Sequence, residues 1–392
     1  MNEAVIVDVV RTPVGRGKPG GALSGIHPVD LMAPVLQAVL TRNGLESGQV
    51  DDVLLGCVSQ VGEQAYNIAR RSVLAAGFDE TVPAATIDRQ CGSSQQAVHF
   101  AAQGVIAGAY DIVIAGGVES MSRVPLGSSL AGVGGEAALI QERYPEGLVN
   151  QGVSAELIAA KWGLGRDDLD AYAARSHERA AAAADAGLFD ADLLPVHTDA
   201  GLVSRDETIR AGTTTDGLAK LSSAFYTESL AARFPEIGWN ITAGNSSPLT
   251  DGASAALIMS AQRAEELGLR PRARFHAFSV VGDDPLMMLT GPIPATRRIL
   301  DRSGLGIDDI DAYEVNEAFA SVPLAWAEAV GADPARLNPW GGAIALGHAL
   351  GSSGTRLLST LLEHLEHTGG RYGLQTMCEG GGMANATIIE RL

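Results

Sequence analysis

The stretch Asp88–Ala97 reads Asp-Arg-Gln-Cys-Gly-Ser-Ser-Gln-Gln-Ala and joins two different hydrophobic patterns. The short apolar run before it, Val82–Ile87, predicts a strand. After Ser93, apolar residues recur at helical spacing, which predicts a helix. Cys91 would then lie in the turn, where free backbone N–H groups and the helix dipole stabilise a thiolate. This position favours a nucleophile, although a free cysteine is more often a buried, inert residue.

Strand and helix patterns continue around this turn and recur late in the chain. An acidic turn before a strand occurs in both copies and matches Asp52 with Asp309. We interpret the chain as two copies of one α/β unit, with mixed or largely parallel sheets and helices on their faces. The predicted strands are 4–10, 111–115, 253–259, 274–281, 372–377 and 386–390, and the predicted helices are 30–43, 66–76, 167–186, 294–303 and 353–365.

The segment between the copies differs in character. It has Gly-rich loops and one long Ala-rich helix but few strand signals. We predict an inserted loop domain at 120–239, an N-terminal half formed by 1–119 with 240–270, and a C-terminal half at 271–392.

Composition indicates a globular protein and narrows its partners. The 392 residues are 46% hydrophobic and 19% charged. The net charge of −18 argues against nucleic acid as a partner. Three cysteines do not form a disulfide framework, and Cys57 is interpreted as structural. No apolar run approaches the length of a membrane span. These features predict a cytoplasmic protein without membrane insertion.

Four clusters carry residues suited to chemistry. They are the Cys91 turn, Asn316 after a strand of the second copy, His348 in the Gly-rich run 338–354, and Cys378 before three glycines. Histidine is the usual acid or base near neutral pH. A thiol at Cys378 would face backbone N–H groups. Each residue also has a structural interpretation: a loop histidine, a buried small cysteine, or an asparagine that caps a turn.

Together, the four clusters resemble the thiolase family. The resemblance covers the whole chain and adds the motifs 11–13, 116–122 and 242–247. It implies the thiolase fold, in which two duplicated five-stranded mixed-sheet α/β halves form an αβαβα arrangement with an inserted loop domain. It also implies an acyltransferase that cleaves a 3-ketoacyl-CoA with CoA, giving acetyl-CoA or propionyl-CoA and a shortened acyl-CoA.

The resemblance assigns a role to each matched residue. Cys91 would attack the 3-keto carbon and become acylated, and His348 would take its proton. Cys378 would protonate the acetyl-CoA enolate and then deprotonate the incoming CoA. His348 and a water held by Asn316 would bind the enolate oxygen, whereas the N–H groups of Cys91 and Gly380 would bind the tetrahedral oxyanion.

Coenzyme A is implied as a co-substrate, with no permanently bound cofactor and no metal. Positions that match family CoA contacts are Arg210 for the nucleotide, Ser247 for the pantetheine arm, Ala243 nearby, and Ala318 and Phe319 along the tunnel. The resemblance also implies a homodimer through a sheet edge of the first unit, or a homotetramer through the loop domain.

Several positions depart from the family pattern. Ala349 and Ser94 replace a proline and a glycine, and Glu379 follows Cys378. Because neighbours in a strand point to opposite faces, we expect Glu379 to point away from the site. Asn150-Gln151-Gly152 stands where short-chain enzymes carry His-Met-Gly. With the Cys-Gly-Ser-Ser-Gln-Gln and Cys-Glu-Gly-Gly-Gly motifs, this resembles degradative actinobacterial thiolases and favours a longer, branched or ring-derived substrate, as in fatty-acid or steroid degradation.

Other functions use some of the same residues. Biosynthetic Claisen condensation would need the same set and differs only in direction. Ketoacyl synthases use a Cys-His-His set, against which Cys378 and Asn316 argue. A non-catalytic lipid-binding scaffold would be marked by loss of Cys91, His348 or Cys378, and none is lost. A papain-like protease would leave the Gly-rich motifs unexplained.

Overall fold

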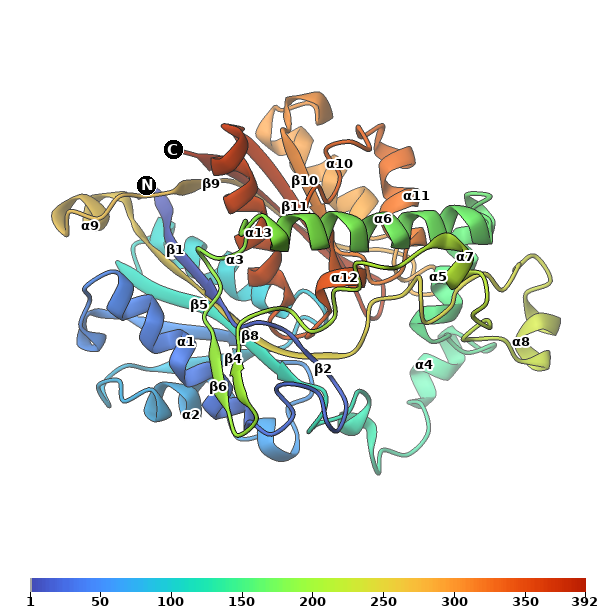
Figure 1. The fold of residues 1–392 in the computed structure, drawn as a ribbon, viewed down its shortest axis with the longest axis horizontal. Helices are drawn as coiled ribbons and strands as arrows, with labels where there is room; N and C mark the ends of the chain where they lie inside the picture. The colour runs from blue at the N-terminus through green and yellow to red at the C-terminus, as the bar shows by residue number, and fades with distance from the viewer. Residues whose placement is uncertain (1) are drawn as a thin grey trace.

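The computed structural model describes residues 2–392. All strands but β6 and β7, which form a separate hairpin, belong to one sheet (Figure 1). The order is β10-β11-β12-β9-β1-β8-β5-β3-β4, with β2 paired to β8. The strands are β1 (Ala4–Arg11), β2 (Gly15–Arg16), β3 (Asp52–Gly56), β4 (Ala84–Ile87), β5 (Ile112–Ser120), β6 (Val196–Thr198), β7 (Gly201–Val203), β8 (Thr250–Ser260), β9 (Ala273–Gly282), β10 (Ala312–Val315), β11 (Tyr372–Glu379) and β12 (Met383–Arg391).

The path divides into two similar halves, as the sequence predicts. β4, β3, β5, β8 and β1 form the first, in which β3 is parallel to both β4 and β5. β9, β12, β11 and β10 form the second, and the strand pairing between the halves consists of two residue pairs between β1 and β9. A single parallel bridge between Tyr313 and Leu337 takes the place of the strand that would match β4.

The repeat offset is 260 residues, so the predicted match of Asp52 with Asp309 is wrong. Asp51 accepts backbone N–H groups from Asp111 and Ile112. Asp311 accepts the same bonds from Arg371 and Tyr372, each 260 positions later. Asp309 instead caps the short helical turn before β10. The neighbouring aspartates look alike in sequence, so the sequence alone paired the wrong two residues of the repeat. The hydrogen bonds show the correct pairing.

Helices lie on both faces of the half-sheets and between them. α1 and α2 cover the outer face of the first half, α10 covers that of the second, and α3 packs against α13 between the halves. The helices of four or more residues are α1 (Pro28–Arg42), α2 (Ile68–Ala75), α3 (Ser93–Ala107), α4 (Ala138–Arg143), α5 (Gln151–Lys161), α6 (Arg166–Asp185), α7 (Thr215–Leu218), α8 (Glu228–Arg233), α9 (Ala261–Glu266), α10 (Pro292–Ser303), α11 (Ser321–Val330), α12 (Ala343–Leu346) and α13 (Ser353–Thr368).

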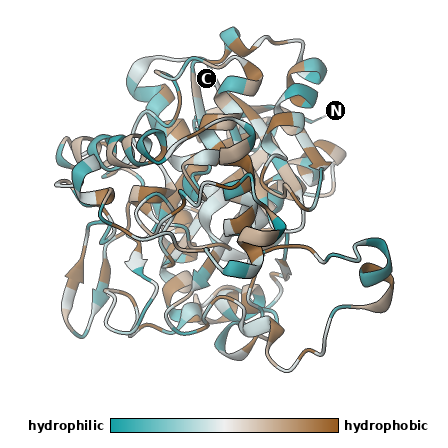
Figure 2. Cartoon of the chain, turned by 90° about the vertical axis from the view of Figure 1, so that its right-hand side faces the viewer, coloured by the Kyte–Doolittle hydropathy of each residue, from teal (hydrophilic) through white to brown (hydrophobic). Residues whose placement is uncertain are grey.

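Hydrophobic burial explains this layering. β1, β5 and β8 are buried along their whole lengths, as expected for strands covered by helices on both faces. Peripheral helices alternate apolar and polar segments, which is the amphipathic pattern (Figure 2). α2 begins two residues later than predicted, because Tyr66 and Asn67 have positive φ angles and Asn67 caps the helix. In the described part of the chain, no helix has the length and apolarity to cross a membrane.

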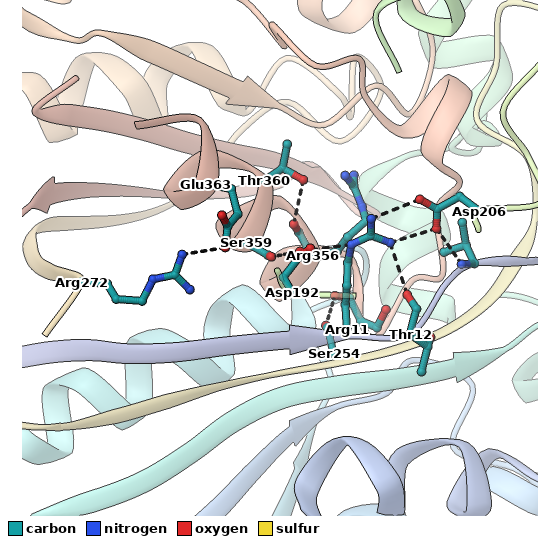
Figure 3. A network of polar contacts seen from close by, with 12 residues as sticks. Arg11, Thr12, Asp192, Asp206, Ser254, Arg272, Arg356, Ser359, Thr360 and Glu363 are labelled. Atoms are coloured by element: carbon teal, nitrogen blue, oxygen red, sulfur yellow. Dashed lines mark hydrogen bonds and ion pairs between the residues drawn. The ribbon is translucent and has the colours of Figure 1, made fainter. Parts of the chain in front are cut away.

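The segment between β5 and β8 is anchored by a buried ionic network (Figure 3). Arg11 at the end of β1 lies between two carboxylates of this segment, with Nε 3.2 Å from Asp192 and Nη1 2.9 Å from Asp206. Ser359 on α13 donates to Asp192. The segment contains α4 to α8 and a β6–β7 hairpin, so it has more regular structure than its sequence indicated. The proposed domain boundaries stay a prediction.

Candidate active site

The Cys91 turn has the predicted strand–turn–helix setting. β4 ends at Ile87 and α3 begins at Ser93. The Ser93 hydroxyl donates to the carbonyl of Gln90 at 2.5 Å and accepts the N–H of Arg89 at 2.9 Å. These bonds hold Gln90 at a positive φ of 47°. The turn therefore fixes Cys91 immediately before the helix, where it is only 4% exposed.

Two backbone N–H groups face the Cys91 sulfur, which is itself held protonated by its surroundings. Burial raises the pKa of the Cys91 thiol to about 12, and the nearby Glu379 carboxylate adds to this. The N–H groups of Cys91 and Gly380 act in the opposite direction, because they hydrogen-bond the charged form. The nucleophile therefore needs a base, and the same N–H pair can stabilise an oxyanion that forms beside it.

Cys378 brings a second thiol to the same place from the other half. It lies on β11 opposite Ala384 of β12 and is 1% exposed. Burial raises the pKa of this thiol well above its usual range, and the proximity of Cys91 raises it further. A protonated thiol beside the nucleophile can serve as a proton donor.

His348 is oriented by Ser353, a residue that the sequence analysis missed. The Ser353 hydroxyl donates to the Ala349 carbonyl at 2.8 Å, so it accepts from Nδ1 of His348 at 2.7 Å. This network assigns the proton to Nδ1 and leaves Nε2 with its lone pair. Burial lowers the pKa of His348 to about 3, aided by Arg356, so the ring is neutral at physiological pH.

Asn316 faces His348 from the loop after β10. Its Nδ2 lies 3.4 Å from Nε2 of His348, and its Oδ1 is buried without a partner. In the described residues, no hydrogen bond joins His348 to either thiol, a common state in the absence of substrate. The structure thus brings Asn316 and His348 into contact, and Cys91, Cys378 and Gly380 into a second group.

Glu317 anchors the elements that carry these residues. It accepts from Tyr172 and Ser176 on α6 and from the backbone N–H of Ile344 on α12, which leads directly to His348. Asn338 adds a fourth bond at 3.0 Å. The predicted Asn316-Glu317 motif therefore includes a structural carboxylate, which fixes the His348 loop to the inserted segment.

The predicted CoA-contact residues occupy two different settings. Ala318 and Phe319 are buried, and the Ser247 N–H donates to the Ala318 carbonyl at 3.0 Å. Ala243 and Arg210 are exposed. Arg210 makes no ion pair with any described residue, so its guanidinium is free to meet an anion. Their roles in CoA binding stay predictions.

Glu379 corrects one expectation. It does point away from Cys378, as strand alternation predicts, but it lies beneath the Cys91 turn. A Cβ built on Gly92 would collide with its Oε1. Glu379 also contributes to the raised pKa of both thiols. Strand alternation predicts the face of β11 on which Glu379 lies, but not that the Cys91 turn packs on that face.

Two glutamines border Gly380. A Cβ built there would lie 3.1 Å from Oε1 of Gln90 and 3.5 Å from Nε2 of Gln151. Gln151 is the first residue of α5, so the departure noted in the inserted segment lies beside the thiol group. Among residues 2–392, no three histidine, cysteine or acidic side chains are grouped as a metal site would require.

The site contains a buried cysteine before a helix, two N–H groups facing it and a neutral histidine. Acyl-transfer enzymes that act through a cysteine use these elements. Family comparison makes this specific. Residues 4–262 match the thiolase N-terminal domain and residues 269–391 match the thiolase C-terminal domain. The chain belongs to the thiolase family.

Individual relatives cover the whole chain. A protein of Mycobacterium tuberculosis named steroid 3-ketoacyl-CoA thiolase FadA6 is 49% identical over 100% of this chain and 95% of its own. A 3-ketoacyl-CoA thiolase of Serratia proteamaculans is 43% identical over 100% of both chains. The crystal structure of the Bacillus anthracis acetyl-CoA acetyltransferase is 37% identical, with a TM-score of 0.89, and covers 100% of this chain and 99% of its own. The thiolase fold predicted from the sequence is confirmed.

Proposed function

We propose that the protein cleaves a 3-ketoacyl-CoA with CoA, yielding acetyl-CoA or propionyl-CoA and a shortened acyl-CoA. The observation that carries this proposal is the pairing of Cys91 and Cys378, buried thiols from opposite halves of the duplicated fold, beside the N–H groups of Cys91 and Gly380. Family membership and the names of the relatives support the same reaction.

The first half-reaction transfers the acyl group to the enzyme. The proton of Cys91 passes to Nε2 of His348, and the thiolate attacks the 3-keto carbon. The C2–C3 bond then breaks, its electrons form the acetyl-CoA enolate, and Cys378 supplies a proton to C2. The N–H groups of Cys91 and Gly380 stabilise the tetrahedral oxyanion, and His348 with a water on Asn316 stabilises the enolate oxygen.

The second half-reaction restores the thiols. The Cys378 thiolate takes the proton of the CoA thiol, and CoA attacks the acyl group on Cys91. The carbon–sulfur bond to Cys91 breaks, and its thiolate recovers the proton from His348. Each thiol therefore ends as it began. Arg210, Ser247, Ala243, Ala318 and Phe319 are the residues we propose for contacts with CoA.

The substrate class we propose is a longer, branched or ring-derived 3-ketoacyl-CoA. Gln151 lies beside Gly380, at the middle position of the stretch where short-chain enzymes carry His-Met-Gly, and this departure supports the proposal. The name of the M. tuberculosis relative supports a steroid-derived substrate in particular.

We also propose a cytoplasmic homodimer or homotetramer. All three cysteines are free, which fits a reducing compartment. β4 ends the strand order and offers an edge for pairing. Apolar side chains are exposed in the inserted segment, as at an oligomer contact; these are Leu126, Leu130, Val133 and Leu139.

The test is CoA-dependent loss of 3-ketoacyl-CoA absorbance with acetoacetyl-CoA, a medium-chain substrate and a ring-bearing substrate. We expect turnover that favours the two larger substrates and disappears in Cys91→Ala. A preference for acetoacetyl-CoA would overturn the substrate assignment. Absence of turnover with all three, from a protein that binds CoA, would favour a lipid-binding scaffold.

A further inference from the structure

Glu119 and Glu379 are equivalent residues of the two halves, separated by the repeat offset of 260 positions. Glu119 lies near the end of β5 and Glu379 ends β11. Each side chain reaches the turn that precedes the central helix of the other half. Glu119 meets Gly351 before α13, and Glu379 meets Gly92 before α3.

Glu119 is surrounded by donors. Its carboxylate accepts the backbone N–H groups of Val58, Ser59 and Gly351 at 2.9, 3.0 and 2.9 Å. The amide of Gln64 adds a bond of 2.7 Å. Burial raises the pKa of Glu119, but these four N–H donors act in the opposite direction and favour the charged form, and they tie the two halves together.

Glu379 has the same burial and none of these donors. It is 0% exposed, and neither carboxyl oxygen has a partner among the described residues. The nearby amide nitrogen of Asn385 donates to the Gly92 carbonyl at 3.0 Å, and the Asn385 Oδ1 also has no partner among the described residues. A buried carboxylate without donors is costly when charged, whereas the protonated acid is not.

The charged groups facing Glu379 come from the turn and from its own strand. Arg89 favours ionisation and Asp88 opposes it. Arg89 forms no ion pair with the carboxyl group, and its Nη1 lies 3.8 Å from the sulfur of Met383 instead. The remaining titratable neighbours are the thiols of Cys91 and Cys378.

We propose that Glu379 is a positioning residue that stays protonated during catalysis. Its ionisation suppresses thiolate formation at Cys91. The uncharged acid fills the space beneath Gly92 without opposing a negative sulfur. Once ionised, it places a like charge behind the nucleophile, and two nearby charges of one sign resist forming together. This inference rests on the proposed role of Cys91.

The consequence is a weaker pH dependence of the reactivity of Cys91. Burial raises the pKa of Glu379 to about 8, with Asp88 adding to the shift and Arg89 opposing it. The acid is therefore mostly protonated at pH 7 and mostly ionised at pH 9. Reactivity of Cys91 should rise with pH less steeply than that of an isolated thiol, because Glu379 ionises over the same range.

The decisive experiment compares Glu379→Gln with Glu119→Gln, the same substitution at the equivalent position. The rate of Cys91 alkylation by iodoacetamide is measured from pH 6 to 10 by peptide mass spectrometry. In Glu379→Gln we expect the thiol to titrate about one pH unit lower, so that alkylation near pH 8.5 is up to about tenfold faster. The melting temperature should not fall.

Glu119→Gln should behave in the opposite way. It should lower the melting temperature, because an amide cannot accept all four bonds, and shift the alkylation profile less than Glu379→Gln does, because the Glu119 charge raises the pKa of Cys91 less than the Glu379 charge does. A Glu379→Gln profile that superimposes on the wild type, or an equal shift in Glu119→Gln, would overturn the proposal. Alkylation needs no turnover, so this result is independent of whether thiolysis is observed.

Infrared titration of the wild type supplies a second measurement that requires only one stable variant. A buried carboxylic acid gives a carbonyl band that disappears as it ionises. Burial raises the pKa of both Glu379 and Glu314 to about 8, so we expect a band that is lost near pH 8 in the wild type and is smaller in Glu379→Gln and Glu379→Met. A band of equal amplitude in the wild type and both variants would contradict the proposal.

Discussion

The turns before α3 and α13 occupy equivalent places in the two halves and carry different chemistry. Ser93 and Ser353 both begin a central helix, and each hydroxyl donates to a carbonyl of its own turn. Ser93 accepts a backbone N–H, whereas Ser353 accepts from the ring of His348. The two halves thus share one scaffold. The serine hydroxyl of the first half fixes the turn that carries the nucleophile, and the equivalent hydroxyl of the second half orients the base.

Packing enforces this division. Cys91 and Gly351 are equivalent positions, but only the first has room for a side chain. A Cβ on Gly351 would lie 2.5 Å from the carbonyl oxygen of Val118 and 2.6 Å from that of Gly56. The second half therefore cannot hold a nucleophile where the first does, and its contribution comes from His348 on the preceding loop.

Removing the nucleophile should have the largest effect. Cys91→Ala should reduce kcat/KM for thiolysis by at least about 10⁴-fold, because no covalent intermediate can form. Cys57→Ala is the matched control: it removes a buried thiol outside the site and should retain most activity. Equal loss in both variants, with normal melting temperatures, would contradict the assignment of Cys91. Absorbance of the 3-ketoacyl-CoA gives the rates.

Removing the base should have the next largest effect. His348→Ala should lower kcat by about 10²- to 10⁴-fold. Because the pKa of His348 is lowered to about 3, the wild-type kcat profile should show no loss near pH 6.5, where an ordinary histidine gains its proton.

Stability should respond in the same pH range. Between pH 6.5 and 3 the unfolded state binds a proton that folded His348 does not, so this histidine makes stability fall as pH is lowered. Urea titrations of the wild type and His348→Ala should show a smaller acid-side loss in the variant. A kcat that falls with a midpoint at pH 6.5 only when His348 is present would contradict the lowered pKa.

Crowding the second turn should affect stability more than chemistry. Gly351→Ala should lower the free energy of unfolding by about 1–3 kcal/mol, because two backbone carbonyls must move. Gly25→Ala, where no atom lies within 4 Å of the built Cβ, should change it by less than about 0.5 kcal/mol. Urea denaturation measures both. Equal stability of the two variants would show that the Gly351 turn tolerates a side chain.

The smallest effect is expected at the rim of the site. Gln151→Ala should change the ratio of kcat/KM between medium-chain and short-chain substrates by up to about tenfold, because it alters one side chain beside Gly380. Alkylation of Cys91 should be unchanged. An equal loss of kcat/KM with every substrate would show that Gln151 contributes to catalysis and not to substrate specificity.

The sequence predicted the elements with strong periodicity and the residues in distinctive motifs. The strand, turn and helix around Cys91 and the long helix α13 are where the hydrophobic pattern placed them. The thiolase fold followed from motifs in one order along the chain. Local pattern suffices here because each motif is contiguous and the central strands β1, β5 and β8 are buried on both faces.

Contacts made by individual polar side chains could not be predicted in this way. The 260-residue offset depends on hydrogen bonds of Asp51 and Asp311, which resemble their acidic neighbours in sequence. Ser353 is one serine among several until its bond to His348 is seen. Glu379 was judged from strand alternation, which identifies its face of the strand but not the turn that packs there. Each error concerns a side-chain contact that hydrophobic periodicity does not encode.

The central claim is that Cys91 forms the covalent acyl-enzyme and that Cys378 moves protons. The most direct measurement is intact-mass and peptide mass spectrometry after brief exposure to a medium-chain 3-ketoacyl-CoA without added CoA, followed by acid quenching. We expect an acyl adduct of the shortened chain on Cys91, none on Cys378, and none in Cys91→Ala. An adduct on Cys378, or turnover without any acylated cysteine, would contradict the account.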